Sequence, residues 1–203
     1  MIYLDNSATT KPHKEVLDTF VQVNESYYAN PASIHEAGVT ANKLLMRARE
    51  QVAQILNTEA KEVIFTAGGT ESNNFAIFGT AKASTHKGKH ILTTEIEHPS
   101  VLEAVKRLAQ AGFEVDYLHV DRNGVISLDE LRDKVRKDTI LVSIMHVNNE
   151  MGAIQPIEEA AKIIHANSRA LFHVDAVQSF GKLSVTFNGE AGPDILSISG
   201  HKI

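Results

Sequence analysis

The chain has 203 residues, of which 43% are hydrophobic and 22% are charged, and this is the composition of a folded globular protein. Its formal net charge of −5 at pH 7 disfavours nucleic acids and anionic membranes as general partners. Because the chain contains no cysteine, a disulfide scaffold, a thiolate zinc site and a cysteine nucleophile are excluded within these residues.

Targeting and membrane signals are not found in the sequence. No apolar run approaches the roughly 18 residues of a membrane-spanning helix, so we expect no membrane span. The first ten residues include Asp5 and lack a basic segment before an apolar core, which predicts that there is no secretory signal peptide. We therefore expect a cytoplasmic protein.

The first 60 residues predict two helices. One covers about residues 12–28, with an apolar face that includes Leu17 and Phe20. The other covers about residues 34–56, and Ser33 with Glu36 forms the pattern of a capping box at its start. We expect these helices to pack on a sheet or to reach a partner subunit.

From about residue 60, apolar strands alternate with amphipathic helices. The expected strands lie at residues 62–66, 90–94, 114–119, 139–146, 170–175 and 194–199. Helix starts are predicted at Thr70, Pro99, Ser127 (with Glu130) and Pro156. This alternation predicts an α/β fold, with a mostly parallel sheet covered by helices on both faces.

Polar side chains follow five of the six expected strands. Ligands of parallel sheets bind beyond the carboxyl ends of the strands, so these residues predict a site at one edge. In chain order they are Gly68, Gly69 and Thr70; Glu97 and His98; Asn148, Asn149 and Glu150; Asp175 and Gln178; and Ser199, His201 and Lys202.

Four of these groups have a functional and a structural interpretation. The Gly69-Thr70 turn could cradle an anion at a helix start, or Thr70 could cap that helix, and its spacing matches neither a Walker loop nor a dinucleotide fingerprint. A buried Asp175 could pair with a pyridinium or another cation, or cap the following helix. His98 could stack on a flat ligand or move protons, or cap a turn. Lys202 could form a Schiff base in a desolvated pocket, or lie on the surface.

Two other features predict no site. The alternating charges of residues 129–137 are typical of a solvated helix face. The ten histidines lack the spacing of a metal-binding motif such as His-Glu-x-x-His, so we expect no metal site.

Five motifs occur in the order and spacing of the cysteine desulfurases, and the whole chain resembles the NifS/IscS-like group of that family. They are Thr-Ala-Gly-Gly-Thr-Glu-Ser-Asn-Asn (66–74), Glu-His (97–98), His-Val-Asn-Asn-Glu-Met-Gly (146–152), His-Val-Asp-Ala-Val-Gln-Ser (173–179) and Ser-Gly-His-Lys (199–202). Residues 5–10 and 30–35 resemble the opening motifs of the family. These are pyridoxal-phosphate (PLP) enzymes of the class V aminotransferase superfamily, with fold type I.

The resemblance implies a role for nine of these strand-end residues. Lys202 resembles the catalytic lysine that binds PLP as a Schiff base, and His98 resembles the catalytic residue that stacks on the PLP ring and takes part in proton transfer. Asp175 looks like the partner of the pyridine nitrogen, and Gln178 looks like the partner of the ring phenolate oxygen. The other residues resemble cofactor ligands: Gly69, Thr70, Ser199 and His201 at the phosphate, and Asn149 beside cofactor and substrate.

The resemblance also implies a reaction and partners. The family takes sulfur from L-cysteine, leaves L-alanine, and passes the sulfur as an enzyme persulfide to Fe–S scaffold or tRNA-thiolation proteins. Fold type I enzymes are usually homodimers, so a second copy of the chain is an expected partner.

One feature departs from the family. Its persulfide cysteine, its substrate-binding arginine and most of its small domain follow the Schiff-base lysine, whereas this chain ends at Ile203. We therefore expect a piece of a longer enzyme that is inactive alone: residues 16–203 as a truncated PLP-binding large domain, and residues 1–15 as a segment associated with an absent C-terminal small domain. The alternatives are another class V PLP-dependent aminotransferase or lyase, and a non-catalytic PLP-binding or dimerisation remnant.

Overall fold

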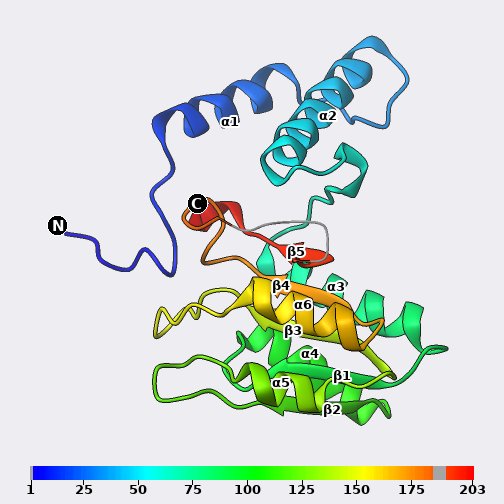
Figure 1. The fold of residues 1–203 in the computed structure, drawn as a ribbon. Coiled ribbons are helices and arrows are strands. Elements are labelled where there is room, and N and C mark those ends of the chain that lie inside the picture. The colour runs from blue at the N-terminus through cyan, green and yellow to red at the C-terminus, as the bar shows by residue number, and fades with distance from the viewer. Residues whose placement is uncertain (1, 185–190) are drawn as a thin grey trace. The chain divides into compact units, whose positions relative to one another are not determined.

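The computed structural model describes residues 2–184 and 191–203 (Figure 1). The chain forms two compact units, one of Met1–Ala8 with Thr66–Ile203 and the other of Thr9–Phe65. Every helix within the described ranges is too short or too polar to traverse a lipid bilayer.

The Thr9–Phe65 unit contains the two predicted helices, α1 (Lys14–Ser26) and α2 (Glu36–Leu56), and then the short 3-10 helix η1 (Ala60–Glu62). The predicted capping box of α2 is wrong. His35 is the N-cap, and its Nδ1 accepts a hydrogen bond from the backbone N–H of Gly38 at 3.3 Å. Helix α2 starts too late for Ser33 to cap it.

Residues 62–66, predicted as a strand, do not form one. Glu62 ends η1, and the residues after it pair with no strand among those that the structure describes. Side chains hold this backbone instead: the Glu62 carboxylate accepts from the backbone N–H of Glu59 at 2.9 Å, and Arg49 donates to the carbonyl of Val63. An apolar run becomes a strand only where a neighbouring strand completes its backbone hydrogen bonds.

The larger unit is built on a five-stranded sheet in the order β2-β1-β3-β4-β5. The strands are β1 (His90–Thr94), β2 (Glu114–Leu118), β3 (Thr139–Met145), β4 (Leu171–Asp175) and β5 (Ile195–Ser197). All neighbouring pairs are parallel, and each strand lies within two residues of its predicted bounds. The predicted parallel α/β sheet is confirmed.

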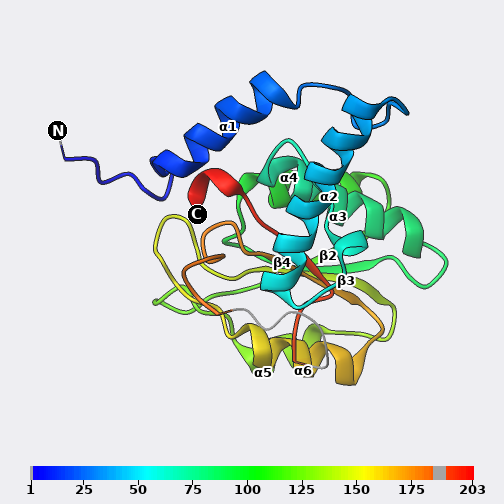
Figure 2. The same ribbon diagram turned by 90° about the horizontal axis from the view of Figure 1, so that it is seen from above.

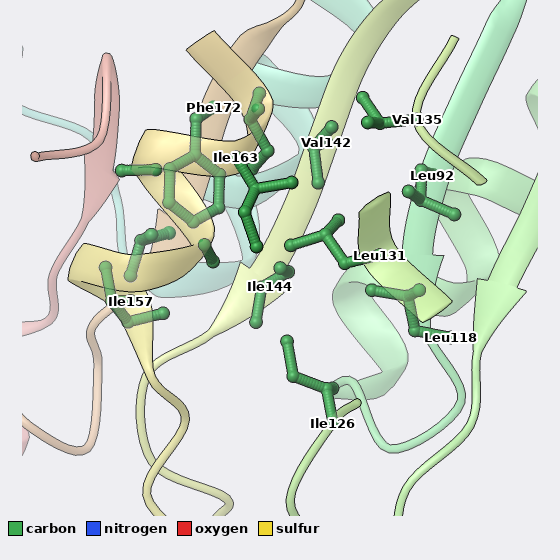
Figure 3. Packing of buried hydrophobic residues seen from close by; sticks show 14 of the residues in the cluster. Leu92, Leu118, Ile126, Leu131, Val135, Val142, Ile144, Ile157, Ile163 and Phe172 are labelled. Atoms are coloured by element: carbon green, nitrogen blue, oxygen red, sulfur yellow. The ribbon is translucent and has the colours of Figure 1, made fainter. Parts of the chain in front are cut away.

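Helices cover both faces of this sheet, as predicted. Helices α3 (Gly69–Ser84) and α4 (Pro99–Gln110) lie on one face, and α5 (Leu128–Lys134) and α6 (Ile157–Asn167) lie on the other (Figure 2). Each face has its own buried apolar cluster. Phe172 and Val142 pack in the cluster beneath α5 and α6 (Figure 3), whereas Ile91 and Leu141 pack beneath α3 and α4.

The strand periodicity decides which polar residues face α3. Successive side chains of a strand point to opposite faces of the sheet. Because Phe172 and Val174 belong to the α5–α6 cluster, His173 and Asp175 point to the α3 face. The buried Asp175 carboxylate is therefore placed beneath the start of α3.

Two of the four predicted helix starts are confirmed. Pro99 opens α4, and Ser127 caps α5 by accepting from the backbone N–H of Glu130 at 3.2 Å. Thr70 is not a cap, because α3 begins at Gly69 with Gly68 as its N-cap. Pro156 is the N-cap of α6 and does not lie within its first turn.

Candidate active site

The carboxyl ends of three neighbouring strands lie side by side because their ladders are in register. Met145 at the end of β3 pairs with Asp175 at the end of β4, and Asp175 pairs with Ser197 at the end of β5. The residues that follow these strands are therefore brought to one edge of the sheet, beside the first turn of α3.

A pocket with a cavity volume of about 160 Å³ opens at this edge of the sheet. All nine residues predicted to bind a cofactor line it: Gly69, Thr70, His98, Asn149, Asp175, Gln178, Ser199, His201 and Lys202. Four residues that were not predicted also line it: Asn73, Ser100, Met145 and Val177. The topology thus gathers the whole predicted set from five separate segments.

Asp175 is a buried carboxylate that is held by neutral donors. One oxygen, Oδ2, accepts from the side-chain amide of Asn73 at 2.7 Å, and Oδ1 accepts from the backbone N–H of Val177 at 3.0 Å. No cationic side chain pairs with it among the described residues. A buried carboxylate without a cation favours a positively charged ligand group beside it.

His98 caps a helix, as one of its two interpretations proposed, and it also lines the pocket. It is the N-cap of α4, and its Nδ1 accepts from the backbone N–H of Ser100 at 3.1 Å. The Ser100 hydroxyl lies 2.8 Å from the same nitrogen. The ring also lines the pocket, so capping fixes a side chain that can contact a ligand.

Lys202 lies at the end of a tight turn after β5. The 3-10 helix η2 (Gly200–Lys202) closes this turn, and the Lys202 N–H donates to the carbonyl of Ser199 at 3.2 Å. The Ser199 hydroxyl lies 2.9 Å from Nδ1 of His201. Among the described residues, Nζ of Lys202 forms no hydrogen bond or ion pair, so a primary amine is free in the pocket.

The start of α3 forms another wall. The first N–H groups of a helix have no acceptor within the helix, and the N-cap Gly68 offers no side chain to them. A Cβ atom at Gly69 would lie 3.0 Å from Val177 Cγ2 and 3.6 Å from Ser199 Cβ, so glycine permits this close approach. Together with the Thr70 hydroxyl, these groups suit an anion.

Asn149 and Gln178 are held by different means. Asn148, the residue before Asn149, is buried and accepts from the backbone N–H groups of Glu150 and Met151 at 2.9 and 2.8 Å, which fixes the turn. The Gln178 amide donates to the carbonyl of Ser7 at 2.9 Å. One N–H of that amide is left for another partner.

Two further buried groups flank Asp175. Burial raises the pKa of Glu97 to about 8, and the charge of Asp175 also raises it, although hydrogen bonds from the Met145 N–H and the Thr94 hydroxyl lower it. Burial lowers the pKa of His173 to about 4, against the opposite influence of Asp175. Both groups are mostly neutral at pH 7, so Glu97 adds little negative charge beside Asp175 and His173 supplies no positive counter-charge to it.

The unpredicted pocket residues had a weak signal in the sequence. Asn73 follows Gly69 and Thr70 by one helical turn, so it shares their face of α3. Ser100 lies two residues after His98. Helix periodicity could have found Asn73, but the contact of Ser100 with it depends on how α3 and α4 pack.

Sequence comparison agrees with this architecture. The family described as Aminotransferase class-V matches residues 2–203, so the chain belongs to the class V aminotransferase family. Enzymes of this family generally depend on PLP.

Within the family, this chain is similar to cysteine desulfurases. It is 47% identical to "Cysteine desulfurase IscS" of Dictyoglomus turgidum over 201 residues, which are 99% of this chain and 50% of the relative. It is also 47% identical to "Cysteine desulfurase, mitochondrial" of Saccharomyces cerevisiae, over 100% of this chain and 40% of the relative. A solved structure named "NifS-like protein" matches with a TM-score of 0.94 and 40% identity, over 99% of this chain and 55% of that one. The chain therefore spans about half the length of the relatives that it matches.

Proposed function

We propose that this chain forms the PLP-binding part of a cysteine desulfurase. The observation that carries the proposal is the single pocket in which an unpaired lysine amine, a buried carboxylate, a histidine ring and an uncapped helix start meet. The similarity to cysteine desulfurases supports the choice of reaction within the family.

The side chains of the pocket fit the chemical groups of PLP. Asp175, which accepts only from neutral donors, would hold the protonated pyridine nitrogen. Lys202 would attach the cofactor covalently through Nζ, and Gln178 would donate to the ring oxygen. The phosphate would lie at the start of α3, with Gly69, Thr70, Ser199 and His201 as its ligands. His98 would stack on the ring, and Asn149 would lie beside cofactor and substrate.

In the reaction, the chain's own residues would orient the cofactor and move protons. When bound, PLP withdraws electrons from the Cα of an amino-acid substrate. Nζ of Lys202 would remove the proton from that Cα. Asp175 would keep the pyridine nitrogen protonated, and His98 would take part in proton transfer at the substrate.

The proposed substrate is L-cysteine, and the proposed products are L-alanine and a persulfide. These 203 residues contain no cysteine, so the thiol that accepts the sulfur must come from outside them.

We further propose a homodimer, and an Fe–S scaffold or tRNA-thiolation protein as the final acceptor. Residues 16–203 would be the large domain, with residues 1–15 associated with a small domain. A cytoplasmic location stays a prediction, since the relatives include a mitochondrial protein.

The test is product analysis with the protein expressed from its complete coding sequence. It is incubated with PLP, L-cysteine and dithiothreitol as an external thiol. We expect L-alanine and sulfide in equal amounts, and neither product from the Lys202→Ala variant. Pyruvate, ammonia and sulfide in place of L-alanine would identify a lyase instead, and a keto acid that forms only after an amino-accepting keto acid is added would identify an aminotransferase. The 203-residue chain without an added thiol should release no sulfide.

A further inference from the structure

A chain of side-chain hydrogen bonds joins His98 to Asp175 across two residues that have no proposed role. The Asn73 amide donates to Asp175 Oδ2 at 2.7 Å and to the Ser100 hydroxyl at 2.9 Å. The Ser100 hydroxyl is in turn 2.8 Å from His98 Nδ1. Asn73, Ser100 and Asp175 are all buried, with exposed fractions of 1%, 8% and 5%. The chain is therefore made of three buried residues and the half-buried His98, all of which line the pocket.

The donors and acceptors of this chain can be oriented in only one way. A carboxylate only accepts, so the Asn73 group that faces Asp175 must be its NH₂, and the same NH₂ donates its second proton to Ser100. The Ser100 hydroxyl accepts from Asn73, and its single proton is then free to point at His98. The backbone N–H of Ser100 can only donate, and it also points at Nδ1. Nδ1 of His98 thus receives two donors and carries no proton of its own.

We propose that Asn73 and Ser100 are positioning residues that hold His98 as the Nε2–H tautomer and fix its ring in the pocket. The orientation is set at the far end by Asp175, because its charge decides which way the Asn73 amide turns. The ring nitrogen that remains for a ligand is Nε2, and it bears a proton.

The remaining atom of Asn73 supports this role. Its Oδ1 is buried and has no hydrogen-bond partner among the described residues. Such an unsatisfied oxygen costs stability in a protein interior. The Asn73 amide therefore acts through its two N–H donors. A rotation of the amide by 180° would place Oδ1 against the Asp175 carboxylate, where two oxygens repel each other.

The role of His98 toward a cofactor rests on the proposed function, whereas the hydrogen-bond chain is a property of the protein alone. The two can fail separately. If the tautomer is as proposed but PLP does not bind, the proposed function is wrong and the positioning role stands.

The first test is the tautomer of His98 in the whole, cofactor-free chain. The protein is labelled with ¹⁵N-histidine and studied by NMR at about pH 8, above the ordinary histidine pKa of about 6.5. The His98 signals are assigned by their loss in His98→Gln. We expect an unprotonated, pyridine-type Nδ1 and a protonated, pyrrole-type Nε2. A protonated Nδ1 in the unmodified protein would overturn the proposal without any variant.

The second test asks whether Asn73, whose amide bonds to Ser100 and Asp175 and not to His98, controls the His98 ring. In Asn73→Ala we expect the His98 Nδ1 signal to shift and the single-tautomer pattern to be lost. Ser100→Ala should act in the same way, and Ser100→Thr should restore the pattern because it keeps the hydroxyl. Ser127→Ala is the matched control, since it removes a serine from another helix start. An unchanged Nδ1 signal in a folded Asn73→Ala protein, judged by the signals of the other histidines, would contradict the coupling.

Discussion

Glu97 and His173 are both buried near Asp175, and each is held in its neutral form. For Glu97, the bonded oxygen Oε1 accepts from the Thr94 hydroxyl at 2.8 Å and from the Met145 N–H at 2.7 Å. The other oxygen, Oε2, has no partner in the described part of the chain. Burial therefore dominates, and the raised pKa of Glu97 makes stability depend on pH.

The direction of this pH dependence follows from the pKa of Glu97 in the unfolded and in the folded protein. In the unfolded chain Glu97 loses its proton near its ordinary pKa of 4.5, whereas in the folded protein it keeps the proton up to about pH 8. Folding is therefore favoured at low pH by this group, and the benefit is lost as pH rises through that window. His173, with its pKa lowered to about 4, acts in the opposite direction, but only below its ordinary pKa of 6.5. The effect of Glu97 is thus isolated above pH 6.5.

We predict that Glu97→Gln flattens the pH dependence of stability between pH 6.5 and about pH 8. In the unmodified protein, Glu97 should lower the free energy of unfolding by at most about 1.4 kcal/mol for each pH unit in this window. Urea unfolding at several pH values measures the slope. Glu95→Gln, which removes an exposed carboxylate two residues away, is the control and should keep the slope. Equal slopes for Glu97→Gln and the unmodified protein would show that Glu97 is ionised in the folded state.

At the scale of elements, strand β4 carries Asp175, and its largest buried side chain, Phe172, packs it against the helices. Phe172 is completely buried in the cluster beneath α5 and α6 (Figure 3). Its removal leaves a cavity that the surrounding strands and helices fill only in part.

We predict that Phe172→Ala lowers the free energy of unfolding by about 3–5 kcal/mol. Phe75→Ala is the matched control, because Phe75 lies on α3 and is 61% exposed. That change should cost less than about 1 kcal/mol. Chemical unfolding of the two variants side by side provides the comparison, and similar costs would mean that the cluster does not hold β4 as described.

The elements also show what sequence could predict. The alternation of strands and helices, the near-continuous apolar run of β3 and the polar residues after the strands predicted both the sheet and its functional edge, because parallel strands place their carboxyl ends together. The strand predicted at residues 62–66 was wrong, because the local sequence pattern does not show whether a partner strand is present. Asn73 and Ser100 were missed because their contact depends on the packing of α3 against α4.

At the scale of the whole molecule, the sheet unit alone contains every residue of the proposed cofactor pocket. All thirteen lining residues belong to the unit of Met1–Ala8 and Thr66–Ile203. We therefore predict that these 203 residues bind PLP covalently, whatever further segments the reaction with L-cysteine requires.

The most direct test of this claim is the intact mass of the chain after incubation with PLP and reduction with borohydride. We predict the 22.2 kDa chain plus one reduced cofactor, attached at Lys202 by peptide mapping, and no adduct at that site in Lys202→Ala. An unmodified mass, or a cofactor attached at other lysines and unaffected by Lys202→Ala, would contradict the assignment of the pocket.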